Sequence, residues 1–326
     1  MHIGTFAYSK KLAHSSKKNT VSLLGFGLTL LGALLFSTKA IIVKKAFAAT
    51  QVDAVSLLAL RMACALPFYL AAVWIAGNKE NVQPLSRRQW WQVLLLGITG
   101  YYLSSLFDFI GLQYISAGLE RLILFLYPSF AVLINAAVFK QKLSKLQLAA
   151  LFLTYIGIAI AYWGELRMDT ANPMFFVGSF FVFLCAITYA IYIVGSGRLI
   201  PQTGATRFTA YAMLAATAGI FVHFALRGQV SPLYQSAGFW WYGLLLGIVA
   251  TVVPSFLISG GLKRIGSNNV AIISSIGPVS TILQAHFILG EPIFEAQVIG
   301  TALVILGVLL TALQSHYTKL FQYFKN

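Results

Sequence analysis

The sequence predicts an all-α polytopic membrane protein with ten transmembrane helices, arranged as two inverted five-helix repeats. Three observations predict this fold: an apolar composition, ten apolar stretches of helix length, and a repeat with a period of about 150 residues. Of the 326 residues, 59% are hydrophobic and only 10% are charged, whereas about 25% of a typical soluble domain is charged. The chain therefore has too little polar surface to cover a soluble globule of this size.

Each predicted helix follows from an apolar stretch, since roughly 20 mostly apolar residues span a bilayer as a helix. The expected spans are 22–44, 54–76, 90–110, 118–139, 146–164, 174–195, 207–226, 239–262, 268–289 and 296–316. The connectors are short and polar, so we expect a single membrane domain. A membrane β-barrel is excluded because its strands would alternate apolar and polar residues. Lys44 and Lys45 separate the first stretch from Ala46-Phe47-Ala48, which favours a retained first span over a cleaved signal peptide.

The distribution of Lys and Arg predicts the orientation of the helices. With ten spans both termini lie on one side of the membrane, and sixteen of the 23 basic residues fall on that side against four on the other. We therefore expect cytoplasmic termini in the cell inner (plasma) membrane. The net charge of +15 is spread over these loops, which argues against a nucleic-acid partner. Cys64 and Cys185 both lie within apolar stretches and predict no disulfide framework.

A shift of 150 residues aligns the two halves of the chain without gaps. Trp90-Trp91 falls on Trp240-Trp241, and Leu94-Leu95-Leu96-Gly97-Ile98 on Leu244-Leu245-Leu246-Gly247-Ile248. Pro128 falls on Pro278. We expect a cytoplasmic tail at 1–21, a first five-helix repeat at 22–165, a second at 166–316 and a cytoplasmic tail at 317–326. Because five is odd, the second repeat must be inverted relative to the first.

Inverted repeats are a common architecture of secondary transporters, in which the two copies can exchange conformations around a fixed site. A membrane scaffold without transport activity and an intramembrane enzyme are the alternatives from other classes. The enzyme needs a convergent acid, base and nucleophile, and the sequence has no such set. The sequence also has no phosphate-binding loop and no cluster typical of a metal site. We therefore expect no cofactor, metal or catalytic residue.

Several motifs give the chain a family resemblance. They are Leu57-Leu58-Ala59-Leu60-Arg61, the Gly97–Gly111 stretch followed by Leu-Gln-Tyr, Tyr127-Pro128, Gly277-Pro278, Leu289-Gly290-Glu291-Pro292, Gly157 and Gly307. Because these motifs occur in this order over about residues 23–313, the chain resembles the EamA-like family of the drug/metabolite transporter superfamily. The family often has a Gly-Glu pair after the fourth span, where this sequence has Lys140-Gln141. The resemblance implies ten helices around a central cavity and export or exchange of small metabolites such as amino acids. A drug or nucleotide-type substrate is the alternative within transport.

Five charged residues lie within the predicted spans, where ionisable groups are costly and often functional. They are Lys39, Arg61, Asp108, Glu120 and Arg121. All five fall in the half of the membrane away from the termini, and all belong to the first repeat. Ion pairs among Arg61, Asp108, Glu120 and Arg121 are a candidate outer gate. The alternatives are static pairing of Arg61, interfacial positions for Glu120 and Arg121, and pairing of Asp108 with Lys39.

Polar and aromatic side chains within the spans are candidates for the wall of a substrate cavity. The candidate cavity residues are Lys39, Tyr101, Tyr102, Ser105, Phe125, Tyr189, Ser274 and Gln284. Asp108 and His286 are candidate titrating groups, and Pro128 and Pro278 are candidate hinges because proline interrupts a helix. The expected partners are a small-molecule substrate and the lipid bilayer. A proton and a counter-substrate are the candidate coupling partners.

Overall fold

The computed structural model describes residues 23–77, 84–140, 143–168, 172–228 and 237–325. Over these ranges the chain is helical and has no strand, which confirms the all-α prediction. Eight helices of the described residues are long and apolar enough to cross a membrane, and Glu295–Leu310 is a shorter apolar helix. The predicted tail at 1–21 lies outside the described residues.

The helices of the first half run from α2 to α8. They are α2 (Leu23–Thr50), α3 (Ala54–Gly77), α4 (Arg87–Gly97), the π-helix η1 (Ile98–Leu103), α5 (Ser104–Leu112), α6 (Ala117–Leu124), α7 (Tyr127–Phe139) and α8 (Lys145–Met168). The helices of the second half run from α9 to α15. They are α9 (Phe175–Thr203), α10 (Ala205–Arg227), α12 (Ala237–Leu244), the π-helix η2 (Leu245–Val252), α13 (Val253–Ser274), α14 (Gly277–Gln284), the π-helix η3 (Ala285–Leu289) and α15 (Glu295–Lys325).

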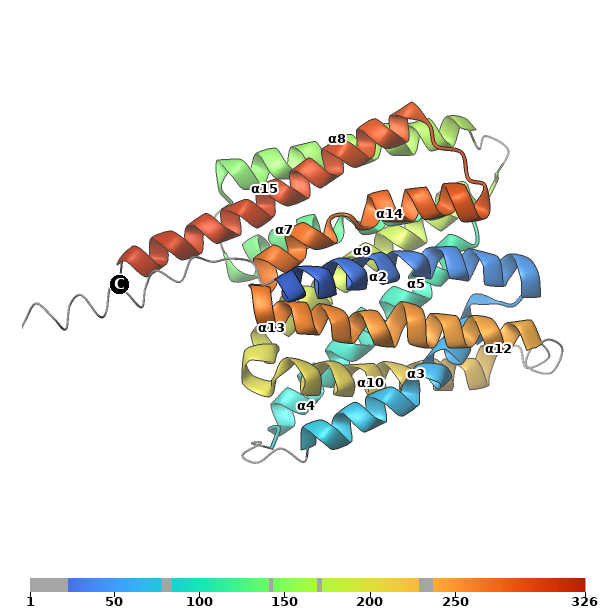
Figure 1. The fold of residues 1–326 in the computed structure, drawn as a ribbon, viewed down its shortest axis with the longest axis horizontal. Coiled ribbons are helices and arrows are strands. Elements are labelled where there is room, and N and C mark those ends of the chain that lie inside the picture. The colour runs from blue at the N-terminus through green and yellow to red at the C-terminus, as the bar shows by residue number, and fades with distance from the viewer. Residues whose placement is uncertain (1–22, 78–83, 141–142, 169–171, 229–236, 326) are drawn as a thin grey trace, which may run out of the picture.

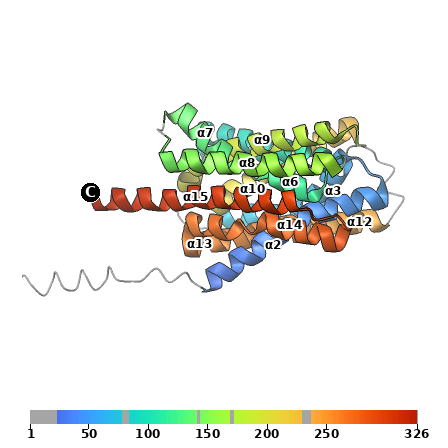
Figure 2. The ribbon, with the colours of Figure 1, turned by 90° about the horizontal axis from the view of Figure 1, so that it is seen from above.

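The helices form one elongated bundle with most axes along its length (Figure 1). The start of α2 and the end of α15 lie at the same end of the bundle in both views (Figure 1, Figure 2). We call this the terminal end and the opposite one the distal end. Capping boxes begin α4 and α8: Ser86 and Gln89 exchange hydrogen bonds, as do Ser144 and Gln147. Each satisfies free N–H groups at a helix start next to a polar connector.

Two spans are broken at matching positions in the two halves. The first break separates α6 from α7, and Pro128 occupies the first turn of α7. The second separates α13 from α14, where Pro278 occupies the first turn. A proline fits the first turn because it has no N–H to satisfy there. The structure thus confirms an interruption at each proline, while the hinge role stays a prediction.

Three helix boundaries differ from the sequence-based expectation. Helix α2 continues to Thr50, past Lys44 and Lys45, because Ala46–Ala49 keeps the chain apolar and helix-compatible. Helix α13 passes without interruption through the connector expected at 263–267. The expected tail from 317 onward continues α15. In each case a short polar segment did not end a helix, since polar side chains alone neither block helical backbone nor remove its hydrogen bonds.

The two halves pack against each other along their full lengths. The most extensive helix contacts are α8 with α15, α2 with α13, α3 with α10 and α5 with α9, and each pairs one half with the other. Helices α8 and α15 lie side by side and run in opposite directions (Figure 1). At their crossing Gly157 lies against the backbone of Gly300, and Gly307 against the backbone of Ala150. Each pair becomes the other when 150 is added to or subtracted from its residue numbers.

Candidate functional site

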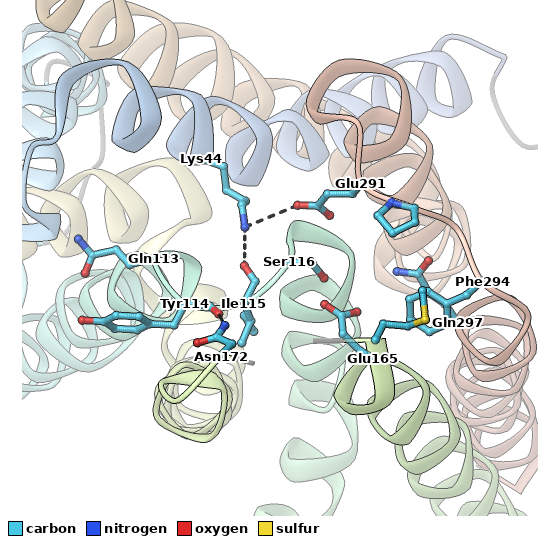
Figure 3. Close-up of a pocket in the computed structure, with 12 residues that line it drawn as sticks. Lys44, Gln113, Tyr114, Ile115, Ser116, Glu165, Asn172, Glu291, Phe294 and Gln297 are labelled. Carbon is cyan, nitrogen blue, oxygen red and sulfur yellow. Dashed lines mark hydrogen bonds and ion pairs between the residues drawn. The ribbon is translucent and has the colours of Figure 1, made fainter. Parts of the chain in front are cut away.

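An open pocket of about 490 Å³ lies at the distal end of the bundle. Its polar side chains come from segments that are far apart in the sequence (Figure 3). The lining residues are Lys44, Gln113, Tyr114, Ile115, Ser116, Glu165, Met168, Asn172, Glu291, Pro292, Phe294 and Gln297. We call it the distal pocket. It lies where α2, α5, α6, α8, α9 and α15 begin or end, so both halves of the chain build it.

Glu291 connects the second half to the first at this pocket. Its Oε1 accepts a hydrogen bond of 3.0 Å from the N–H of Ala117, and its Oε2 accepts one of 3.3 Å from Gly118. These are two of the free N–H groups at the start of α6. A carboxylate is favoured there because the start of a helix carries partial positive charge. Glu291 therefore fixes the first turn of α6 from a loop of the other half.

Lys44 also holds Glu291 in place. Lys44 Nζ lies 3.6 Å from Glu291 Oε1 and donates a 2.7 Å hydrogen bond to the carbonyl of Ile115. Figure 3 shows Glu165 across the pocket from this pair, next to Ser116. Gln297 is buried, and its Oε1 has no hydrogen-bond partner among the described residues. The distal pocket thus has one ammonium, two carboxylates and a free amide oxygen.

A cluster of three charged residues lies deeper in the bundle than the distal pocket. Lys39 Nζ is 2.6 Å from Asp108 Oδ2 and 3.7 Å from Glu120 Oε1. The side chain of Asp108 is 1% exposed and that of Glu120 is fully buried. Each member is four or five residues from a pocket residue on its own segment (Lys44, Gln113, Ser116), or about 6–8 Å along a helix at 1.5 Å per residue. One ammonium therefore lies between two buried carboxyl groups, and it is closer to that of Asp108.

The two arginines of the predicted gate lie apart from this ion pairing. Arg61 is buried, and its Nε donates to Thr251 Oγ1 at 2.9 Å and its Nη1 to Ser105 at 3.3 Å. Its guanidinium also lies 5.6 Å from the centre of the Phe109 ring. Among the described residues neither Arg61 nor Arg121 forms an ion pair with an acid. A gate made of arginine–carboxylate pairs is therefore not formed in this conformation, and its role in another one stays a prediction.

Arg121 lies on α6 next to Glu120 and faces a different neighbourhood. Its guanidinium is 5.6 Å from the centre of the Phe125 ring and lies against Gly277, the first residue of α14. Its Nε is buried without a hydrogen-bond partner among the described residues. Arg121 thus lies between the two broken spans, where α6 contacts α14.

A row of aromatic rings continues from Arg121 toward the middle of the bundle. Phe125 packs edge-to-face on Tyr127, and Tyr127 on Tyr189, with ring centres 5.9 and 5.0 Å apart. Tyr189 stacks on Tyr192, whose hydroxyl is 2.9 Å from that of Tyr101. We call these five rings the aromatic wall. It brings together three of the predicted cavity residues: Tyr101, Phe125 and Tyr189.

Comparison with known proteins identifies the family. A sequence profile of the EamA-like transporter family matches residues 23–163 and again residues 176–313. The chain belongs to the EamA-like transporter family. It is therefore a multi-pass membrane protein and a transporter.

Individual relatives of this EamA-like transporter agree with the assignment. The "Uncharacterized transporter YcbK" of Bacillus subtilis is 31% identical over 297 residues, which cover 89% of this chain and 92% of the relative. The "Uncharacterized transporter YyaM" of the same organism is 27% identical over 218 residues, covering 66% and 71% of the two chains. A crystal structure with 21% identity has a TM-score of 0.63 and covers 89% of this chain and 96% of its own, which supports the fold.

The other predicted site residues of the EamA-like transporter lie outside the aromatic wall and the charge cluster. Tyr102 Oη is 2.9 Å from His223 Nδ1 on α10. His286 is exposed, and its Nδ1 lies 2.9 Å from the carbonyl of Glu291. Gln284 donates to Ser280, one turn earlier in α14, and Ser274 ends α13 before the second break. Their proposed cavity and titrating roles stay predictions.

Sequence reasoning did not predict the residues of the distal pocket as a site. In the sequence, Lys44 marked only the end of the first apolar stretch and Glu291 only a family motif, and Glu165 and Gln297 were not singled out as site residues. One available signal was that acidic residues gather on the distal side of the predicted topology, next to Lys44. Another was Glu291 within the quoted motif Leu289-Gly290-Glu291-Pro292.

Proposed function

We propose that this EamA-like transporter is a secondary transporter that exports or exchanges small organic metabolites, such as amino acids, by alternating access around a midplane cavity. We further propose ten membrane-spanning helices in two inverted five-helix repeats. We also propose that the protein lies in the cell inner membrane with both termini in the cytoplasm. In this orientation the distal pocket opens on the outer side of that membrane.

The pair of broken spans is the observation that carries this proposal. The breaks precede Pro128 and Pro278, which are 150 residues apart. Discontinuous helices near the centre of a bundle are a recurring feature of substrate sites in secondary transporters. Here one break is next to the aromatic wall, and Arg121 lies against the residue that begins α14 after the other.

The contacts between the halves support an exchange of conformations. Gly157 with Gly300 and Gly307 with Ala150 are reciprocal contacts in the two repeats. Gly97 on α4 lies against the backbone of Ala212 on α10, and Gly247 lies against the backbone of α3 at Arg61. A rocking motion about such close crossings would keep the helix interface intact while the cavity opens first to one end of the bundle and then to the other.

Transport is tested with purified protein in liposomes. Vesicles loaded with isotopically labelled metabolites, including amino acids, organic acids and amines, are diluted into buffer, and efflux is compared with protein-free vesicles. The proposal expects saturable flux of at least one class, accelerated by the same unlabelled compound on the far side. Folded protein with no flux across the panel would refute secondary transport. Flux that the unlabelled compound on the far side does not accelerate would refute exchange, and export would then be the mode of transport.

A further inference from the structure

Arg121 is a charged side chain inside the bundle that has no hydrogen-bond or ion-pair partner among the described residues. Its Nε is buried. A guanidinium stays charged at any physiological pH and has five N–H donors in a planar fork. By contrast, Arg61 has both a threonine and a serine hydroxyl as hydrogen-bond acceptors. Arg121 therefore has unused capacity for an anion.

The guanidinium of Arg121 packs between the start of α14 and the ring of Phe125. Gly277 faces it, and a β-carbon at that position would come within 2.7 Å of the Nη2 atom. Helix α14 begins at Gly277. The Phe125 ring lies on another side, at 5.6 Å. Neither neighbour supplies a negative charge, and the positive end of α14 adds to the potential of the guanidinium.

The aromatic wall determines what kind of molecule could bring the anion. It begins at Phe125, next to Arg121, and continues through Tyr127 and Tyr189. Tyr127 follows Arg121 by six residues and packs edge-to-face on Tyr189 of α9. A ligand with its acid group on Arg121 would therefore lay its body on aromatic faces, which favour flat or apolar groups.

The charge cluster limits the charge of this ligand. Glu120 precedes Arg121 on α6, and with Asp108 it shares the single ammonium of Lys39. A ligand with two negative charges would be repelled by these acids in a medium of low dielectric constant. A planar carboxylate with a single charge matches the guanidinium fork, which binds it through two parallel hydrogen bonds.

We propose that Arg121 binds the carboxylate of an organic monocarboxylate whose aromatic or apolar body lies against Phe125, Tyr127 and Tyr189. This inference rests on the proposed function and names the substrate class of the same cavity. Arg121 is then the residue that selects acids over amines and amides of the same shape.

Three probes that differ mainly in the head group test this assignment: phenylacetate, phenylacetamide and phenethylamine. Thermal unfolding of the purified protein in detergent is followed at rising concentrations of each. A compound that binds only the folded protein raises its Tm. We expect phenylacetate to raise Tm and the amide and the amine to have little effect. Equal stabilisation by phenylacetate and phenylacetamide would overturn the assignment.

The variants Arg121→Gln and Arg121→Lys separate binding from a structural role. Glutamine should weaken the apparent affinity for phenylacetate at least about tenfold, or about 1.4 kcal/mol, and lysine should retain part of it because it keeps the charge. Arg167→Gln is the matched control, since Arg167 is exposed at the end of α8 over Trp163. An unchanged phenylacetate response in Arg121→Gln would also overturn the assignment. If that variant does not fold, Arg121→Lys and Gly277→Ala carry the same test, because both disturb the guanidinium site.

The liposome assay keeps this inference distinct from the proposed function. Flux of amines or neutral compounds that is insensitive to Arg121→Gln would leave the transporter intact and reject the carboxylate site. Flux of phenylacetate that Arg121→Gln abolishes, while Arg167→Gln retains it, supports both. Arg121-dependent binding of phenylacetate without flux of any compound would support the site and reject secondary transport.

Discussion

Lys39 Nζ lies 2.6 Å from Asp108 Oδ2 in the interior of the bundle, and the same ammonium is 3.7 Å from Glu120 Oε1. Three helices, α2, α5 and α6, meet at this one cation. Breaking a buried ion pair by removing one partner leaves an uncompensated charge and costs about 3–5 kcal/mol. Lys39 is therefore the residue whose charge keeps α5 and α6 together against α2.

We expect Lys39→Met to be strongly destabilising, because it leaves the buried carboxylate of Asp108 without its cation. The loss should be about 3–5 kcal/mol and should appear as a large fall in Tm of the purified protein. The double variant Lys39→Met/Asp108→Asn should lose less than the sum of its single variants, with a coupling of about 0.5–3 kcal/mol. Lys45→Met is the control, since Lys45 is exposed on the same helix. Additive losses in the double variant would contradict the pairing.

Much of the fold could be predicted from the sequence, because apolar length and a 150-residue repeat are properties of the linear chain. The interruptions at Pro128 and Pro278 could also be predicted from the sequence, because proline has no N–H to donate within a helix. The partners of the charges could not be predicted, because they depend on segments that meet only in the fold. Ala117 and Glu291 are 174 residues apart, and Lys44 and Ile115 are 71 apart. The sequence limited the candidate partners of Asp108 to Lys39 or an arginine. Only the packing of the helices shows that the partner is Lys39.

We expect Glu291→Gln to weaken the attachment of α6 to the second half of the chain. The amide has one acceptor oxygen and no charge, so it cannot satisfy both Ala117 and Gly118 or complement the helix start. The loss should be about 1 kcal/mol, measured as a lower Tm. Glu295→Gln is the control for the loss of charge at a helix start alone, because Glu295 is exposed in the first turn of its own helix α15. An equal change in both variants would show that Glu291 does not hold α6.

The proposed orientation predicts opposite accessibility at the two ends of the bundle. In a chain with Cys64 and Cys185 replaced by alanine, Met168→Cys should react with a membrane-impermeant maleimide added to intact cells. Met168 is 63% exposed at the distal pocket. Arg88→Cys, near the terminal end, should react only after the membrane is opened. If Arg88→Cys were labelled in intact cells and Met168→Cys were not, the topology would be the opposite of the proposed one.

The crossing of α8 and α15 predicts equal sensitivity of two glycines in different repeats. A β-carbon at Gly157 would collide with the backbone of Gly300, and one at Gly307 with the backbone of Ala150. Because backbone atoms cannot move aside as a flexible side chain can, Gly157→Ala and Gly307→Ala should each cost about 1–3 kcal/mol. Gly197→Ala, on α9, meets no heavy atom within 4 Å and should leave Tm unchanged or slightly raised. Thermal unfolding of the three variants measures this. A large loss at only one of the two crossing glycines would mean that the contacts are not equivalent, and the two-repeat arrangement would lose its main geometric support.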